Sequence, residues 1–161
     1  MSETPSGPDL NRKLAHVRET CLVLTTRQAS NALTRTYNAS LAEVGLEVTQ
    51  FTLLGMIAAE RAGSAAELAR QIGIERSTLA RNLERLIKDG LVTAQSGQGR
   101  RVLYRLTDAG RERLVRAITC WEKAQSAMLA ALPPGMDAAA REQSRALRAA
   151  AQRVSGEVDW N

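Results

Sequence analysis

Residues 64–90 read SAAELARQIGIERSTLARNLERLIKDG, and two short helices joined by a tight turn account for this stretch. Ser64 and Glu67 have the spacing of a capping box, in which each side chain satisfies a free backbone N–H at the start of a helix. Gly73 then permits a tight turn, and Gly90 ends the second helix, because glycine readily adopts the left-handed conformation found after helices. The arrangement predicts a helix-turn-helix.

The second of these helices, expected from Arg76 to Lys88, has one apolar and one polar side. At about 100° per residue its leucines fall within an arc of about 60°; they are Leu79, Leu83 and Leu86. The opposite side carries Ser77, Thr78, Arg81, Asn82 and Arg85. None of these five is acidic, and all can donate hydrogen bonds to base edges or phosphates, which is typical of a helix that reads the major groove.

Positive charge is concentrated around this helix. The chain has a net charge of +5, and residues 75–116 carry this whole excess, with ten basic and five acidic side chains. The rest of the chain holds twelve of each sign. A nucleic-acid-binding surface requires such a basic segment, although a solvated basic face would have the same composition.

A β-hairpin is predicted directly after the helix-turn-helix. Residues 91–95 and 101–106 have strand character, and residues 96–99 form a turn with two glycines. Arg100 and Arg101 would make the hairpin tip positively charged. Thr107 is expected to cap the helix that follows.

Longer helices are predicted on both sides of this unit. Apolar spacing indicates one continuous helix over 10–43 and another over 49–62 with Thr49 as its N-cap. After the hairpin, one helix runs from Thr107 to Pro133-Pro134-Gly135, and a last helix begins near Asp137. The apolar seam of these terminal helices, which includes Leu114 and Trp121 after the hairpin, favours a dimer interface, although packing within one protomer would also bury it.

The predicted fold class is therefore mainly α with a small β-hairpin wing. The predicted domains are a disordered tail at 1–9, a winged helix-turn-helix at 49–106, and a helical dimerisation region formed by 10–48 and 107–161. The longest uncharged run, between Lys123 and Asp137, is interrupted by two prolines, so no membrane span is predicted. The polar N-terminus does not resemble a signal peptide, and a cytoplasmic location is expected.

From about residue 21 to 158 the chain resembles the MarR family of transcriptional regulators. Four stretches carry the resemblance, in the family's order and at its distances: 41–51 (LAEVGLEVTQF), 67–74 (ELARQIGI), 77–92 (STLAR through GLV) and 106–110 (LTDAG). The resemblance implies a homodimer joined by its terminal helices on a pseudo-palindromic DNA operator. A recognition helix would enter each major groove and a wing tip each flanking minor groove, with repression as the usual outcome.

The resemblance also implies which residues face DNA. On the recognition helix they are Arg76, Ser77, Thr78, Arg81, Asn82 and Arg85, and at the wing tip they are Arg100 and its neighbour Arg101. Many family members have an aspartate two residues before the wing-tip arginine, where this chain has Gln98. The resemblance implies that Arg85 contacts phosphate or braces the wing, and with Gln98 such a brace would be a hydrogen bond to the amide instead of a salt bridge.

A small-molecule effector, often an aromatic or phenolic acid, is implied where the dimerisation helices meet the winged domain. Arg27, Asn31 and Arg35 could bind its carboxylate, or they could be solvated or make intersubunit contacts. Some relatives instead sense oxidants through a cysteine in the first helix. Cys21 makes a redox-sensing regulator an alternative, although it lies about two positions out of register, and reduced thiols are the default for a cytosolic chain.

Other classes of function fit the sequence less well. His16 is the only histidine, and paired carboxylates, a phosphate loop and a metal-ligand cluster are all missing, so no enzyme, metal or cofactor is predicted. Five aromatic residues are too few for a protein that stacks single-stranded bases. A winged helix used only for protein contacts is the other alternative, and salt-dependent binding to duplex DNA would exclude it.

Overall fold

The computed structural model describes residues 7–59, 64–97 and 102–156 and confirms the predicted fold class. Its elements are α1 (Gly7–Thr20), α2 (Leu22–Leu41), a 3-10 turn (Ala42–Val44), α3 (Val48–Ala58), α4 (Ala65–Ile72), α5 (Arg76–Lys88), β1 (Val92–Ser96), β2 (Val102–Leu106), α6 (Asp108–Ala131) and α7 (Met136–Ser155). The chain divides into two compact units, Met1–Thr36 and Tyr37–Asn161.

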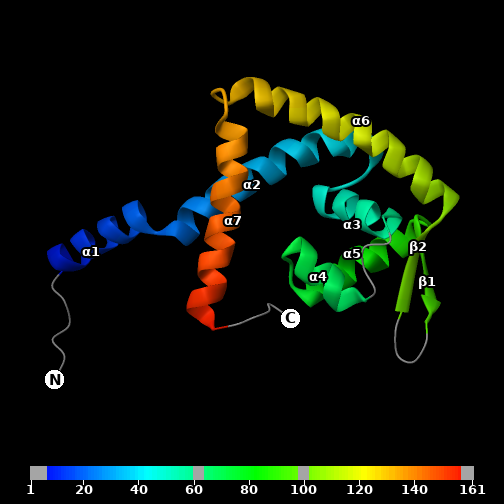
Figure 1. The fold of residues 1–161 in the computed structure, drawn as a ribbon, viewed down its shortest axis with the longest axis horizontal. Coiled ribbons are helices and arrows are strands. Elements are labelled where there is room, and N and C mark those ends of the chain that lie inside the picture. Colours follow the sequence, from blue (N-terminus) through cyan, green and yellow to red (C-terminus); the bar gives the residue numbers. More distant parts are fainter. Residues whose placement is uncertain (1–6, 60–63, 98–101, 157–161) are drawn as a thin grey trace. The chain divides into compact units, whose positions relative to one another are not determined.

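In the second unit, α3 lies between α6 on one side and the α4–α5 pair on the other, with the hairpin beside them (Figure 1). The most deeply buried large side chains of this core are Leu41, Leu53, Leu54, Leu68, Leu79, Leu86 and Val92. Phe51 of α3 stacks on Trp121 of α6 with a ring-centroid separation of 6.4 Å. The helix-turn-helix therefore packs against the apolar core that α3 and α6 share.

The predicted apolar and polar sides of α5 are confirmed. Leu79, Leu83 and Leu86 are all buried, so the opposite face of the helix is directed outward. The turn before α5 contains Gly73 at φ +76°, in the left-handed region. Ser64 accepts a hydrogen bond from the backbone N of Glu67 (3.2 Å), as the predicted cap of α4 requires.

The hairpin is fixed at its root by the residues that begin α6. Thr107 Oγ1 donates to Gly90 O (2.7 Å) and accepts from Gly110 N (2.9 Å). Thr107 N donates to Leu91 O (3.1 Å). The C-terminal end of α5, the start of β1 and the N-terminal end of α6 are thus joined within a few residues.

The continuous first helix predicted over 10–43 is wrong in one detail. Cys21 separates α1 from α2, although helical backbone hydrogen bonds continue across it, from Cys21 N to Val17 O and from Thr25 N to Cys21 O. The hydroxyls of Thr20, Thr25 and Thr26 donate to backbone carbonyls four residues earlier. Such bonds bend helices, which explains a distortion that apolar periodicity does not reveal.

Several predicted boundaries also differ from the structure. Helix α1 begins at Gly7, so the last three residues of the predicted tail 1–9 are helical. Helix α3 begins at Val48 with Glu47 rather than Thr49 as its N-cap, and it ends at Ala58 instead of residue 62. Strand β1 spans Val92–Ser96 instead of 91–95, and α7 begins one residue earlier than predicted.

Helix α7 buries none of its residues. Its Val154 is 88% exposed, and Val115, Ile118 and Leu129 of α6 are also exposed.

No single described helix is long and apolar enough to cross a membrane, although 22–44 and Val48–Ala58, as a bent pair, satisfy that test by length and composition.

Candidate nucleic-acid interface

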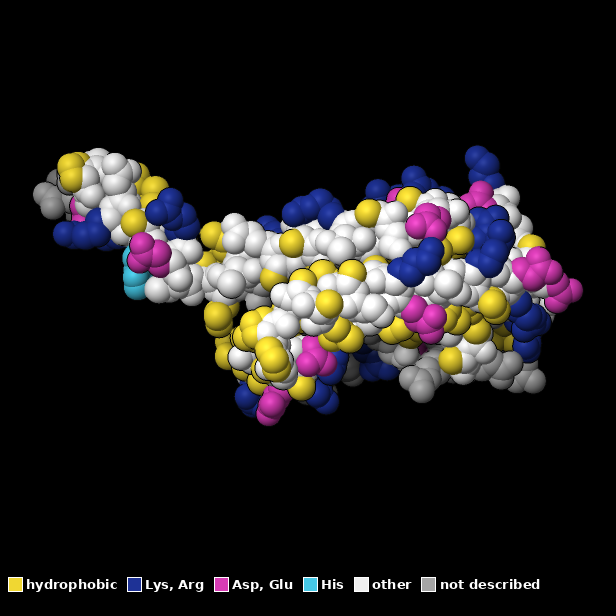
Figure 2. Space-filling view, turned by 90° about the horizontal axis from the view of Figure 1, so that it is seen from above, with side chains coloured by type: hydrophobic (Ala, Val, Ile, Leu, Met, Phe, Trp, Pro, Cys, Tyr) yellow, Lys and Arg dark blue, Asp and Glu magenta, His cyan; other side chains and the backbone are white. Residues whose placement is uncertain are grey.

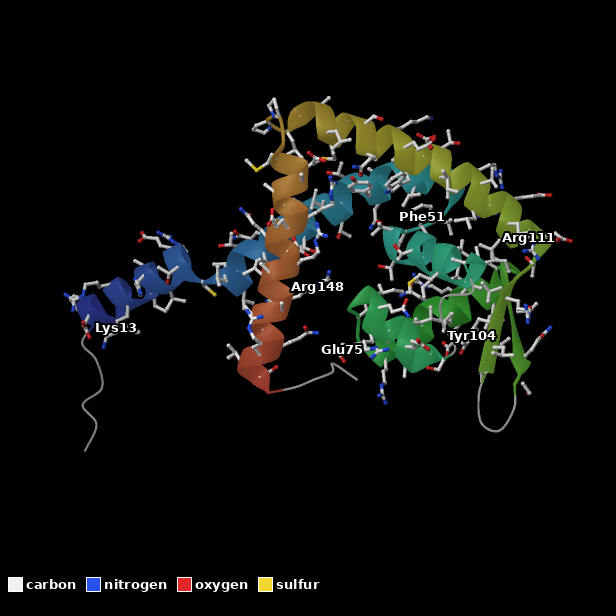
Figure 3. All side chains as sticks on the ribbon, in the orientation of Figure 1. Lys13, Phe51, Glu75, Tyr104, Arg111 and Arg148 are labelled. Atoms are coloured by element: carbon white, nitrogen blue, oxygen red, sulfur yellow. The ribbon has the colours of Figure 1, made fainter. Side chains whose placement is uncertain are left out.

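The outward face of α5 presents the six helix residues that the sequence predicted. Arg76, Ser77, Arg81 and Arg85 are exposed, and Thr78 and Asn82 are half-buried. Glu75, at the start of the helix (Figure 3), makes no side-chain hydrogen bond to the first turn. The amide groups at this end of α5 are therefore not capped by a side chain.

The side-chain hydrogen bonds within α5 differ in length. Arg81 donates to Ser77 O and to Thr78 Oγ1, both at 3.4 Å, which is long for a hydrogen bond. Asn82 Nδ2 donates to Thr78 O at 2.8 Å. The Arg81 guanidinium is thus loosely held and free to exchange these contacts for stronger ones, whereas Asn82 is fixed on the helix.

A groove of about 370 Å³ runs along this face. It is lined by Thr78, Arg81, Asn82, Glu84, Arg85 and Lys88 of α5 and by Glu47 at the start of α3. Glu47 Oε1 lies 3.6 Å from Arg85 Nη1. Four of the six predicted α5 residues therefore line one groove. Arg85 pairs there with the N-cap residue of α3, and Gln98 lies outside the described residues.

Glu47 is held by the residues around it. Gln50, the one buried polar side chain of the described chain, accepts from Glu47 N through Oε1 (2.9 Å). Asn38 of α2 accepts from Val48 N through Oδ1 (2.7 Å). These two bonds fix the backbone at the beginning of α3.

Charge distinguishes α5 from α6. Helix α5 has four basic residues and one acid, whereas α6 has four basic residues and three acids. Figure 2 views the molecule from the α6 side and shows basic and acidic side chains interspersed there. The local excess of positive charge therefore lies on the α5 face rather than on α6.

The other predicted site residues belong to segments of the chain other than α5. Arg100 and Arg101 lie outside the described residues. Arg27, Asn31 and Arg35 are exposed on α2, spaced four residues apart on one side of the helix, in the first unit.

The two cysteines are both free thiols. Cys21 is half-buried, whereas Cys120 is buried and its Sγ lies 3.9 Å from Glu43 Oε2. Asp137 of α7 accepts a hydrogen bond from Arg141 that lowers the pKa of its carboxyl group. Among the described residues no group of three or more His, Cys, Asp or Glu could hold a metal ion.

Sequence reasoning missed three residues that line the groove: Glu47, Glu84 and Lys88. Lys88 lies seven residues after Arg81, which places both on one side of a helix, so periodicity could have identified it. Glu47 and Gln50 have the three-residue spacing of a capping box, but nothing in that spacing indicates a partner on α5.

Comparisons with known proteins give consistent matches. A MarR family model matches residues 44–101, from the end of the 3-10 turn into the wing. The transcriptional regulator MosR of M. tuberculosis is 34% identical, with a TM-score of 0.72 over 82% of this chain and 98% of that chain. Its complex with DNA matches at 34% identity and a TM-score of 0.68, over 81% and 98% of the two chains.

A second protein of the same organism is also similar. A MarR family protein of M. tuberculosis in complex with p-aminosalicylic acid is 26% identical, with a TM-score of 0.58 over 81% of this chain and 98% of that chain. No curated protein matches the sequence.

Proposed function

Because the chain belongs to the MarR family of DNA-binding transcriptional regulators, we propose that it binds a specific duplex operator through the polar face of α5. The observation that carries the proposal is that face itself, where Thr78, Arg81 and Asn82 line one groove above buried leucines. Arginine and asparagine are suited to bidentate contacts with guanine and adenine in the major groove. MosR, which is 34% identical, has been solved in complex with DNA, and this supports DNA as the partner of the present chain.

Phosphate contacts complete the proposed interface. Arg76 and the uncapped first turn of α5 are suited to bind one phosphate, since helix N-termini attract anions. Arg100 and Arg101 would reach the flanking minor groove, where readout depends mainly on groove width and A·T content.

Binding to duplex DNA is expected to weaken steeply with salt. Two protomers with three to four phosphate contacts each would give a slope on the order of −6 for log affinity against log salt concentration, because each contact releases counterions. Titration of a duplex from site selection measures this slope, with a scrambled duplex as control. A slope near zero for both duplexes would favour a protein-interaction module and contradict the proposal.

The functional unit is proposed to be a homodimer formed by the terminal helices. The exposed apolar side chains of α6 and α7, with Val154 at 88% exposure, support a second chain as their partner. Two reading helices related by two-fold symmetry would then read the two half-sites of a pseudo-palindrome, about one helical turn apart.

Removal of residues 133–161 is expected to leave an aggregating or unfolded product, because it deletes α7 from the proposed interface and leaves the exposed apolar side chains of α6 without a partner surface. Sedimentation equilibrium and far-UV circular dichroism would measure this, with the full chain as control at twice its mass of 17.5 kDa. A soluble, folded monomer from the shortened chain would refute the proposed interface.

Regulation by a small aromatic acid, with repression relieved on binding, is the last part of the proposal. The relative in complex with p-aminosalicylic acid supports this class of effector. Arg27, Asn31 and Arg35 are proposed to bind the carboxylate, because they form an exposed polar row on α2. Guanidinium groups bind carboxylates in a bidentate geometry.

A further inference from the structure

We propose that Glu47 is a positioning residue for operator recognition. It orients Arg85 on the polar face of α5, the reading face, before DNA binds. The proposal rests on the DNA-binding function proposed above. It gives the N-cap of α3, which is not part of the helix-turn-helix, a role in selectivity.

Two hydrogen bonds hold the backbone from which the Glu47 side chain extends. Its own backbone N donates to the buried Gln50, and the next backbone N donates to Asn38 of α2. Bonds from two different helices therefore hold the chain at this position. A carboxylate that extends from a hydrogen-bonded backbone limits the positions that the Arg85 guanidinium can take while the two are paired.

The ion pair contributes orientation rather than stability. The side chains of Arg85 and Glu47 are 66% and 57% exposed, and their atoms are 3.6 Å apart. Exposed pairs of this kind add little to the free energy of unfolding, since solvent screens them. Ordering a long side chain before binding, however, reduces the entropy that is lost when the complex forms.

Orientation and charge have different effects on selectivity. A phosphate contact made by a fixed side chain sets the register of the protein on its operator. Binding to unrelated DNA depends on charge and not on register. An oriented Arg85 therefore favours the operator complex, whereas the negative charge of Glu47 weakens binding to every duplex equally.

Glu47→Gln tests this distinction, because glutamine keeps an oxygen for the helix cap and removes the charge. The readout is the selectivity ratio, defined as Kd for a scrambled duplex divided by Kd for the selected operator. We expect the ratio to fall about fivefold, as for the loss of one ordered side chain per half-site. In an Arg85→Gln background, Glu47→Gln should leave the ratio unchanged.

Two control variants separate the possible causes. Glu43→Gln breaks a pair of similar length and exposure, 3.5 Å from Lys123 with side chains 59% and 63% exposed, outside the groove. It should leave the selectivity ratio unchanged. Glu84→Gln removes a carboxylate that lines the groove and has no ion pair among the described residues. It should strengthen binding to both duplexes by the same factor.

The outcomes are distinct. A fall in the ratio for Glu47→Gln that disappears in the Arg85→Gln background, with an unchanged Tm, would support the proposal. An unchanged ratio, or an equal fall in both backgrounds, would overturn it while wild-type binding to the operator persists. If the wild-type protein binds no duplex in a salt-dependent way, the DNA-binding function fails first and this inference fails with it.

Discussion

Gly110→Ala is expected to destabilise the protein by about 3 kcal/mol, near the upper end of the range for overpacking a well-packed site. A Cβ atom at Gly110 would lie 2.0 Å from Leu91 O and 3.0 Å from Leu91 C. These are backbone atoms, and Leu91 O also accepts from Thr107 N. The added methyl group can therefore be accommodated only if the root of the wing moves away from α6.

The measurement is thermal unfolding, where a loss of this size lowers Tm by about 6–12 °C for a chain of this length. Gly55→Ala is the matched control. Gly55 lies inside α3, and a methyl group added there would meet nothing within 4 Å, so alanine should be neutral or stabilise by up to about 1 kcal/mol. Equal Tm values for Gly110→Ala and the wild-type protein would contradict the prediction.

Arg81→Ala is expected to cost roughly 1–3 kcal/mol of discrimination at one base pair of each half-site. Arg81 is exposed in the centre of the reading face and is held only by two contacts of 3.4 Å. It can therefore exchange these contacts for a bidentate contact to guanine at little cost. Selection of bound sites from random duplexes should show a relaxed preference at that position.

Arg100→Ala should behave differently, because a wing-tip arginine reads groove width in the flanks. Its loss should lower affinity and alter the flanks while the centre of the half-site stays the same. Arg116→Ala on α6 removes the same charge from an exposed position outside the groove and is the control. If Arg100→Ala changed the half-site centre and Arg81→Ala did not, the two grooves would be assigned wrongly.

Helix α5 and its exposed face could be predicted because the residues that define them lie within one short stretch of sequence. Three leucines at helical spacing face the core, and that spacing alone directs Arg81 and Asn82 outward. The beginning of α3 could not be predicted in the same way. Thr49 is a better N-cap by residue type than Glu47, but Gln50 and the distant Asn38 stabilise the earlier start.

The packing of α6 shows a second limit of sequence patterns. The predicted seam of large apolar residues includes Leu114 and Trp121, which are only half-buried. The fully buried side is instead formed by the small residues Ala117, Cys120 and Ala124. Ser40 Oγ donates to Cys120 O at 2.6 Å, a backbone contact that requires close approach of the end of α2. Hydrophobicity ranks large side chains first and so overlooks a close helix contact made by small ones.

Because α6 is attached to the end of α5 at the root of the hairpin, a movement of the far end of α6 would rotate this root. Thr107 and Gly110 fasten one end of this 24-residue helix to the end of α5, and its other end lies about 36 Å away at 1.5 Å per residue. A displacement of about 2 Å at the far end corresponds to a rotation of about 3° at the root for a rod of this length. Because Thr107 holds the root through its hydroxyl and its backbone N, with hydrogen bonds of 2.7, 2.9 and 3.1 Å, such a rotation would be transmitted to α5.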